Sequence, residues 1–398
     1  TNEVVVLERN RPDETFGFGV VFSDKTIAEV ESADPETYRA ITDHFVHWDD
    51  IDVHYGGEMV RSSGHGFSGL SRQTLLTVLQ DQATALGIEI HFECEFAGLE
   101  SGGSVSAARA DGTVSTVSVD LADYDLVLGS DGVNSTLRET WAEHFQPTFD
   151  YRPNRFVWLG TTKPFPAFTF YFRENEHGLW RVHAYQYEPG RSTFIVECTE
   201  EAWLAAKLDQ ASEEETLAYC ADVFADELDG HELIPNRSVW RSFPTIRCAN
   251  WHHENVVLLG DAVHTAHFSI GSGTKLAMES AIALVDALEQ HGSEGVPAAL
   301  AAYEDARRID VLKIQKAAQT SLEWFEDVDR HARLAPEPFV FSLMTRSKRI
   351  TYDNLARCQV GDVVFSYAYA KIGRIGLVES GAETAQKPPE FDGTGEYW

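Results

Sequence analysis

Two apolar segments of this chain end in the same way, with a glycine and an aspartate after each of them. Residues 125–128 lead into Gly-Ser-Asp-Gly at 129–132, and residues 255–259 lead into Gly-Asp-Ala at 260–262. Continuous apolar runs of this kind predict strands that are buried on both faces of a parallel sheet. In open α/β sheets, ligands bind at the carboxyl ends of the strands. The pattern therefore predicts an α/β fold with a ligand site at these two strand ends.

A further strand is predicted at the start of the chain, where Val4–Leu7 form a continuous apolar run followed by Glu8. This run also predicts a strand buried on both faces. An acid at the end of such a strand is the group that holds a ribose hydroxyl in dinucleotide-binding folds. A glutamate that is simply exposed to solvent is the alternative, so the strand supports a nucleotide site without establishing one.

The segment after the second Gly-Asp pair is rich in glycine. Residues 260–275 read Gly-Asp-Ala-Val-His-Thr-Ala-His-Phe-Ser-Ile-Gly-Ser-Gly-Thr-Lys, and a long helix is predicted after Thr274. Glycine lets the backbone approach a ligand closely. The N–H groups at a helix N-terminus favour negative charge. The segment therefore predicts an anion or cofactor site, and a tight connection that binds nothing is the alternative.

Residues 150–245 differ from the rest of the chain. Aromatic and β-branched residues gather at 168–172, 180–185 and 194–197, which predicts antiparallel strands. A second long helical region is predicted over about 298–326. We expect an α/β fold (an α+β composite) in which an antiparallel sheet is inserted into a nucleotide-binding domain and C-terminal helices follow. The expected boundaries are 1–149, 150–245, 246–330 and 331–398.

The net charge limits the partners of the protein. Asp and Glu number 63 against 32 Lys and Arg, a formal charge of −31 over 398 residues. A field of that sign repels nucleic-acid phosphates and anionic lipids, so we expect neither as a partner. No apolar run approaches the roughly 18 residues of a membrane span, and no signal peptide is visible. The five cysteines form no CxxC pair, which favours a reducing, cytoplasmic compartment.

Three segments resemble the class A FAD-dependent aromatic monooxygenases of the p-hydroxybenzoate hydroxylase type. They are Val-Val-Val-Leu-Glu-Arg-Asn at 4–10, the Asp-Gly segment at 125–138 and the Gly-Asp segment at 256–274. The resemblance implies a Rossmann-like FAD-binding domain formed by 1–149 and 246–330, with 150–245 as the substrate domain. It also implies that NADH or NADPH reduces FAD, and that a flavin C4a-hydroperoxide then transfers oxygen to an aromatic ring.

The same resemblance implies which residues hold FAD. Asp261 would bind the ribityl and pyrophosphate side, and Arg72 would pair with the pyrophosphate. The backbone of residues 271–274 would face the flavin pyrimidine edge, where the helix dipole favours an anionic reduced flavin. An exposed helix residue is the alternative for Arg72. The positions carried over as cofactor-binding are Glu8, Arg9, Arg72, Asp131, Gly132, Asp261, Gly271, Ser272, Gly273 and Thr274.

Segments 48–72, 267–279 and 342–350 are similar to a narrower branch, that of salicylyl-CoA 5-hydroxylase and 2-aminobenzoyl-CoA monooxygenase. This branch implies an aromatic acyl-CoA and dioxygen as substrates. The monooxygenases of violacein synthesis have a similar His-Phe-Ser-Ile-Gly loop, so a non-CoA or indole-type aromatic is the alternative.

Several histidines are candidates for contacts with the substrate. His65 and His267 are the candidate acid–base residues, and His47 is a candidate substrate contact. For each of them a structural histidine is the alternative. His264 and His267 also form an HxxH pattern, but no third ligand is placed beside them, so no metal site is expected.

A CoA thioester carries several negative charges, which the acidic surface repels overall. Local cations would have to compensate for that repulsion. Arg346, Lys348 and Arg349 form a basic cluster that we expect to bind CoA in this way, and an ordinary solvated face is the alternative.

One motif of the family does not fit this sequence. The family begins with a strand and a GxGxxG turn roughly 20 residues before the ribose-binding acid, whereas seven residues precede Glu8 here. Either the sequence is a fragment or the first βα unit is absent. Because the second case would remove part of the FAD site, a non-catalytic nucleotide-binding protein is the alternative from another functional class.

Overall fold

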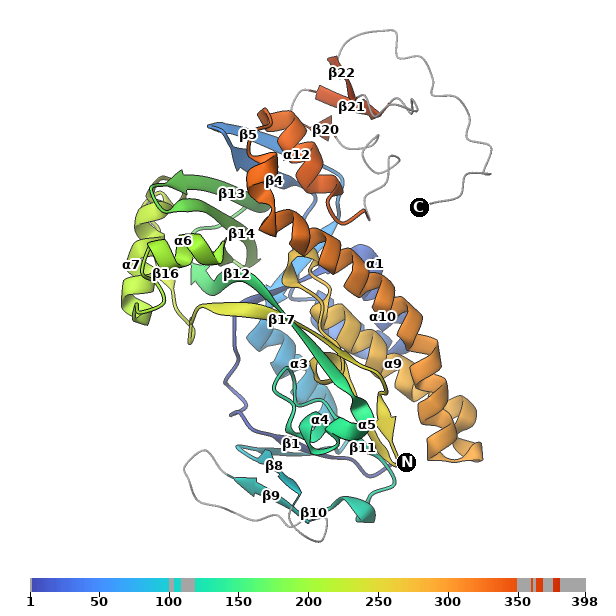
Figure 1. Ribbon diagram of the computed structural model, residues 1–398. Coiled ribbons are helices and arrows are strands. Elements are labelled where there is room, and N and C mark those ends of the chain that lie inside the picture. The colour runs from blue at the N-terminus through green and yellow to red at the C-terminus, as the bar shows by residue number, and fades with distance from the viewer. Residues whose placement is uncertain are drawn as a thin grey trace.

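The computed structural model describes residues 2–99, 104–108, 119–348, 359–360, 363–367 and 375–379. The protein has two halves, which are joined by two long strands. The long strands are β12 (Pro147–Thr161) and β17 (Arg241–Cys248), which pair antiparallel. In Figure 1 they run diagonally from the upper sheet into the lower half of the molecule. Each of these two strands therefore has one end in the upper half and the other end in the lower half.

The upper half is built on one large sheet. Its strand order is β16-β12-β15-β14-β13-β4-β5-β20-β21-β22, with β17 beside β12. The strands not yet given are β4 (Ile51–Tyr55), β5 (Glu58–Ser62), β13 (Phe168–Asn175), β14 (Gly178–Glu188), β15 (Arg191–Cys198), β16 (Leu233–Ile234), β20 (Gln359–Val360), β21 (Val363–Tyr367) and β22 (Ile375–Glu379). The three strands predicted between 168 and 197 are confirmed. The sheet also extends beyond 150–245, because β4 from the N-terminal part pairs parallel with β13.

The two faces of this sheet have different neighbours. On the outer face, Trp180, Val182 and Val196 pack in the cluster that also contains residues of α7 (Glu213–Val223) and α8 (Ala225–Leu228). Because side chains alternate along a strand, Arg181 and His183 of β14 point to the opposite, inner face. The inner face therefore presents polar and aromatic side chains to the rest of the molecule.

The lower half contains small sheets covered by helices. β1 (Val5–Glu8) pairs parallel with β7 (Glu89–Phe92), and β11 (Val127–Gly129) pairs parallel with β19 (Val256–Leu258). The other strands are β2 (Gly19–Ser23), β3 (Val46–Trp48), β6 (Phe67–Ser71), β8 (Glu95–Leu99), β9 (Ser104–Ala108), β10 (Val119–Asp120) and β18 (His252–His253). The helices of this half are α1 (Asp24–Ala33), α2 (Pro35–Thr42), α3 (Arg72–Ala85), α4 (Thr136–Thr140), α5 (Ala142–Phe145) and α9 (Gly273–His291), and α10 (Val296–Glu326) reaches from here to the upper half. The remaining helices pack on the large sheet: α6 (Glu200–Ala205), α11 (Val328–His331) and α12 (Pro336–Thr345).

The parallel pairing of β11 with β19 confirms the α/β expectation, but the prediction that Val4–Leu7 is buried on both faces is wrong. Val5 and Val6 are 36% and 38% exposed, and Leu128 of β11 is 51% exposed. β1 pairs with β7 and β11 pairs with β19, and among the described residues no strand pairs with the second edge of either. The apolar side chains beside these two edges therefore remain accessible.

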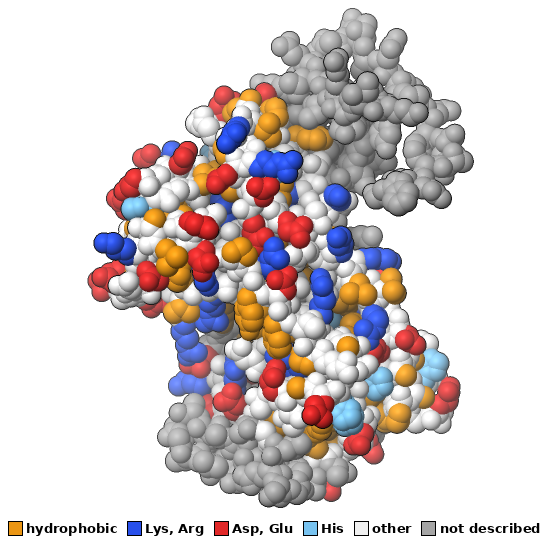
Figure 2. Space-filling view, viewed as in Figure 1, with side chains coloured by type: hydrophobic (Ala, Val, Ile, Leu, Met, Phe, Trp, Pro, Cys, Tyr) orange, Lys and Arg blue, Asp and Glu red, His pale blue; other side chains and the backbone are white. Residues whose placement is uncertain are grey.

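One face of the surface carries charges of both signs side by side. Figure 2 shows acidic and basic side chains interspersed on the visible face. Among the described helices, none combines the length and the apolar character that crossing a membrane requires.

A glycine in β12 tests how closely the two halves pack. A Cβ atom at Gly160 would lie 2.5 Å from the Phe18 ring, so we expect Gly160→Ala to lower the free energy of unfolding by about 1–3 kcal/mol. Gly292→Ala is the matched control, because a Cβ atom there meets nothing within 4 Å. Urea unfolding measures both variants, and equal stabilities would contradict the packing described.

Candidate active site

The Gly-Asp pair lies at the carboxyl end of β19, as predicted. Gly260 has a φ of 57°, which suits glycine, and Asp261 follows in a short 3-10 turn. The Asp261 side chain is accessible to solvent, yet the protein packed around it raises the pKa of its carboxyl, an effect that nearby Arg72 opposes. The fold thus brings Asp261 and Arg72 together from distant parts of the chain.

Arg72 is the first residue of α3 and is largely enclosed. Burial lowers the pKa of its guanidinium, while Tyr185 and Asp261 oppose the shift. Its Nε is buried and has no hydrogen-bond partner among the described residues, and its guanidinium lies 5.8 Å from the centre of the Trp158 ring. The exposed-helix alternative for Arg72 is therefore wrong. A buried cationic donor of this kind can bind a negatively charged oxygen, such as a phosphate oxygen.

The Asp-Gly turn at the end of β11 provides a second polar position. One carboxylate oxygen of Asp131 accepts from the backbone N–H of Leu137 at 3.0 Å. The other, Oδ1, is buried and has no partner in the part of the chain that the structure describes. Gly132 has a φ of 80°, and a Cβ atom there would meet nothing within 4 Å. The turn is open on the side that a ligand could occupy.

The glycine-rich loop leads into α9 as predicted. A 3-10 turn at Phe268–Ile270 is followed by Gly271, whose φ is 60°. The Ser272 side chain does not cap α9 and donates instead to the carbonyl of Ile270 at 3.3 Å. Cβ atoms at Gly271 and Gly273 would meet nothing within 4 Å. The backbone at Gly271 and Gly273 is therefore open where a side chain would lie, and Thr274 after it is half-buried.

Glu8 and Arg9 lie at the end of β1. Oε1 of Glu8 accepts from the backbone N–H and the side-chain amide of Asn10, both at 2.7 Å. Arg9 is exposed and lies 3.7 Å from Glu95. Their roles in cofactor binding stay predictions.

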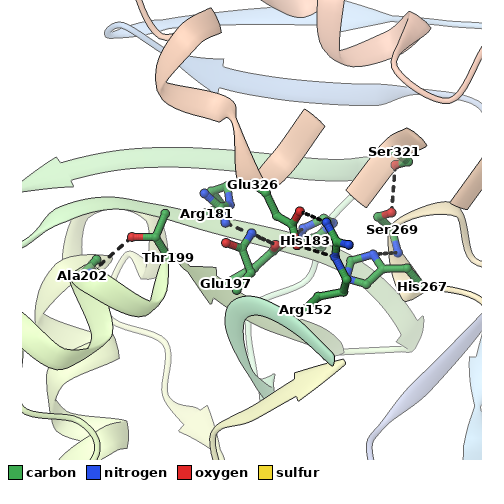
Figure 3. Close-up of polar contacts among 11 residues, drawn as sticks. Arg152, Arg181, His183, Glu197, Thr199, Ala202, His267, Ser269, Ser321 and Glu326 are labelled. Carbon is green, nitrogen blue, oxygen red and sulfur yellow. Dashed lines mark hydrogen bonds and ion pairs between the residues drawn. The ribbon is translucent and has the colours of Figure 1, made fainter. Parts of the chain in front are cut away.

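On the inner face of the large sheet, Glu197 is fully buried among donors (Figure 3). Its Oε1 accepts from Asn154 at 2.7 Å and from Arg181 at 3.2 Å, and its Oε2 lies 3.2 Å from Nε2 of His183. Burial opposes ionisation, but Arg181 and His183 outweigh it and hold the pKa of Glu197 far below its usual range. Glu197 is therefore an ionised carboxylate that can only accept hydrogen bonds.

This carboxylate determines the tautomer of His183. Burial lowers the pKa of the imidazole, so the ring is neutral and its single N–H lies on Nε2, facing Glu197. Nδ1 is then an acceptor. The ring of Phe268, from the glycine-rich loop, crosses His183 edge-on at a centroid distance of 5.5 Å. This pair was not predicted from the sequence, although Arg181 and His183 at alternate positions of an aromatic strand were a signal for it.

His267 is neutral for a similar reason. Burial lowers the pKa of its ring to about 3, and its Nδ1 accepts from the backbone N–H of Ser269 at 3.3 Å. Its N–H is thereby assigned to Nε2. Among the described residues no group of three His, Cys, Asp or Glu side chains is arranged to hold a metal ion.

His65 lies beside an aromatic wall, with its ring 6.1 Å from that of Phe67, whereas His47 is an exposed residue of β3. Nε2 of His65 is 2.7 Å from the Ser62 hydroxyl, and burial lowers the pKa of the ring, with Asp50 and Asp49 opposing. His47 is 3.2 Å from the Ser68 hydroxyl. The wall next to His65 consists of Trp48, Phe67, Phe168 and Tyr185, with ring centroids 5.5–6.5 Å apart.

Arg346 is not part of an exposed basic cluster, contrary to expectation. Its guanidinium lies 5.5 Å and 5.1 Å from the centres of the Phe170 and Phe325 rings. It donates to Ser321, Leu343 and the Ser269 carbonyl at 2.7–2.9 Å. The side chain is held by interior partners, so it does not present a surface cation to CoA. Lys348 is exposed, and Arg349 lies outside the described residues.

Comparison with known proteins assigns this arrangement to a family. Residues 21–318 match the family described as an FAD binding domain. A salicyloyl-CoA 5-hydroxylase from a Streptomyces species is 43% identical over 355 residues, covering 87% of this chain and 65% of the relative. The chain therefore spans less than two thirds of that protein. A protodeoxyviolaceinate monooxygenase from Chromobacterium violaceum is 35% identical, covering 87% of this chain and 88% of the relative.

A solved structure supports the fold. The tetrameric form of 2-methyl-3-hydroxypyridine-5-carboxylic acid oxygenase superposes with a TM-score of 0.63 at 16% identity, over 89% of each chain. At that identity the likeness concerns the fold alone.

A buried histidine behind the loop makes stability depend on pH. Burial, with Arg307 nearby, lowers the pKa of His264 to about 4 from 6.5. The unfolded chain binds this proton between those pH values and the folded chain does not, so stability falls as pH falls. From pH 7 to 5 we expect the wild type to lose roughly 1–2 kcal/mol more than His264→Phe.

Urea unfolding at both pH values measures this difference. His291→Gln, at a more exposed histidine, is the control and should keep the wild-type dependence. A pH dependence unchanged in His264→Phe would show that His264 titrates normally in the folded protein.

Proposed function

The chain belongs to the FAD-binding domain family, and from this premise we propose that it is an FAD-dependent monooxygenase that hydroxylates an aromatic acyl-CoA such as salicyloyl-CoA. One observation carries the proposal: the Nε of Arg72 is buried without a hydrogen-bond partner among the described residues, and the charge of Asp261 opposes the lowering of the Arg72 pKa. Asp261 belongs to the Gly-Asp turn after β19, in the same segment as the N-terminus of α9. NADH or NADPH is the reductant, and the cytoplasm, which supplies both it and CoA thioesters, is the proposed location.

The residues at the strand ends fit FAD. Arg72 offers a buried donor for the pyrophosphate, Asp131 offers an unsatisfied acceptor, and Asp261 offers an accessible carboxylate. The backbone at Gly271 and Gly273 leaves room for a flat ring at the positive end of α9. When bound, FAD supplies the hydride acceptance and oxygen activation that no protein side chain provides.

Aromatic side chains between the large sheet and the strands β3 and β6 provide the surface for the substrate ring. Trp48 and Tyr185 are 5% exposed, and the rings of Phe67 and Phe168 complete the wall. Aromatic rings bind another ring by stacking or edge contacts and keep water from the reacting atoms. His65 stands at the margin of this wall, and we keep it and His47 as candidate substrate contacts.

His183 is a third candidate, beside His65 and His267, for accepting the proton of a substrate hydroxyl. Glu197 orients its ring and leaves Nδ1 as the acceptor. In that step the O–H bond breaks and the proton moves to Nδ1, so that a phenolate and an imidazolium form. The imidazolium is stabilised by the carboxylate behind it.

We infer the substrate class from the name of the relative, a salicyloyl-CoA 5-hydroxylase. The relative that acts on protodeoxyviolaceinate favours an indole-type aromatic as the second candidate. The two differ in chemistry, because a salicyloyl ring carries an ionisable hydroxyl and a thioester.

Purified protein should bind FAD and oxidise NADH or NADPH faster when salicyloyl-CoA is added, with hydroxylated thioester as the product. Absorbance at 340 nm and mass spectrometry measure the two events. Product from an indole-type acid but none from the thioester would select the second candidate. A protein that binds no FAD would leave only a non-catalytic role.

We expect His183→Gln to lower kcat by a factor of about 10²–10⁴ with a much smaller effect on KM, because the proton acceptor is lost. The loss should shrink at high pH, where the substrate hydroxyl ionises without help. His177→Gln, in the turn between β13 and β14, is the control. A wild-type kcat in His183→Gln would exclude the proton-accepting role.

A further inference from the structure

All three polar groups of Ser269 are used inside the protein. Its N–H donates to His267 Nδ1 at 3.3 Å, its hydroxyl lies 2.8 Å from the Ser321 hydroxyl, and its carbonyl accepts from Arg346 Nη2 at 2.8 Å. Figure 3 shows Ser269 between His267 and Ser321 of α10. The loop that precedes α9 is therefore anchored at one residue.

Arg346 closes a ring of hydrogen bonds around this anchor. Its Nε donates to the Ser321 hydroxyl at 2.9 Å and its Nη1 to the Leu343 carbonyl at 2.7 Å, while Nη2 holds Ser269. Because guanidinium nitrogens lie in one plane, all three contacts orient it. The side chain thereby links α12, α10 and the loop.

The direction of the Ser269 carbonyl determines the next peptide group. In a trans peptide the C=O and the following N–H point in opposite directions. With the carbonyl held by Arg346, the N–H of Ile270 points to the other side of the loop. The next residue, Gly271, has a φ of 60° and opens onto free space. The conformation that presents the N-terminus of α9 is therefore coupled to Arg346.

The charge of Arg346 acts in a poorly hydrated place. Its neighbours are the Phe170 and Phe325 rings, and burial lowers its pKa to about 10, with Glu197 opposing. Arg181 lies near the same Phe325 ring, at 5.9 Å. Arg181 donates to Glu197 at 3.2 Å, and Glu197 is the carboxylate that opposes the lowering of the Arg346 pKa. Among these three side chains the positive charges outnumber the negative one, and their charge is weakly screened.

We propose that Arg346 is a positioning residue that holds the loop at 267–271 in the conformation receiving FAD, and that its charge makes the bound flavin easier to reduce. The proposal rests on the proposed function, because it needs FAD at the N-terminus of α9. Reduced flavin carries negative charge, which a nearby buried cation stabilises.

Three variants separate the two parts of this role. Arg346→Gln removes the charge and the three-way hydrogen bonding of the guanidinium. Arg346→Lys keeps the charge but loses the planar set of three donors. Ser321→Ala removes only the hydroxyl shared by Arg346 and Ser269. Arg330→Gln is the control, because Arg330 is 78% exposed and its partner Asp327 lies 3.7 Å away on the surface.

The measurements are FAD affinity by fluorescence quenching, the visible spectrum of bound FAD, and its midpoint potential by dye equilibration. In Arg346→Gln the dissociation constant of FAD should rise about tenfold or more, because the loop loses the charge-assisted hydrogen bond from Arg346 to the Ser269 carbonyl. The midpoint potential of the bound FAD should become more negative. Arg346→Lys should weaken FAD binding and keep a potential close to the wild type. Ser321→Ala should change the spectrum and weaken binding less, with the potential retained.

Unfolding of each apoprotein in urea is measured in parallel. If Arg346→Gln lowers stability but keeps the wild-type potential and FAD affinity, Arg346 is structural only and the proposal fails. If it does not fold, an unchanged FAD affinity and spectrum in Ser321→Ala would overturn the loop role. If the wild-type protein binds FAD and hydroxylates its substrate, the proposed function holds whatever the variants do. If the wild-type protein binds no FAD, both the proposed function and the role of Arg346 are overturned.

Discussion

The ionised carboxylate of Glu197 is the interaction on which the inner face of the protein depends. It lies among Asn154, Arg181 and His183, and thus joins β12, β14 and β15 by their side chains. An isolated charge in such a place would be costly, but here it is the counter-ion that makes two buried guanidinium groups tolerable. It also makes His183 a donor at Nε2 and an acceptor at Nδ1.

The site arises where two differently built halves meet. The lower half contributes strand ends, turns and a helix N-terminus, which are backbone features suited to a cofactor. The upper half contributes a sheet whose inner face carries rings and buried charges. Phe268 belongs to the loop of the lower half, and its ring contacts Phe156 and His183 of the sheet at centroid distances of 4.8 Å and 5.5 Å. This one loop therefore joins the strand ends of the lower half to the inner face of the sheet.

Local features could be predicted from the sequence because they depend on only a few consecutive residues. The glycine-rich loop, the start of α9 and the strands at 168–197 depend on spacing and backbone preference over a few residues. Burial depends on what lies alongside, so Val5 and Val6 were predicted to be covered and are exposed. Arg346 was assigned to the surface for a related reason, since a run of cations does not reveal which of them the fold encloses.

The sequence by itself determined the class of fold and the two strand ends, because these follow from short patterns; the residues that would hold FAD stay a prediction from a family resemblance. Only the tertiary structure decided that Arg72 meets Asp261, that Glu197 orients His183, and that Arg346 holds Ser269. Arg72 and Asp261, and Arg346 and Ser269, are far apart in the chain, and His183 and Glu197 lie on neighbouring strands. Their meeting depends on strand register and on the packing of α10 and α12, which no local pattern encodes.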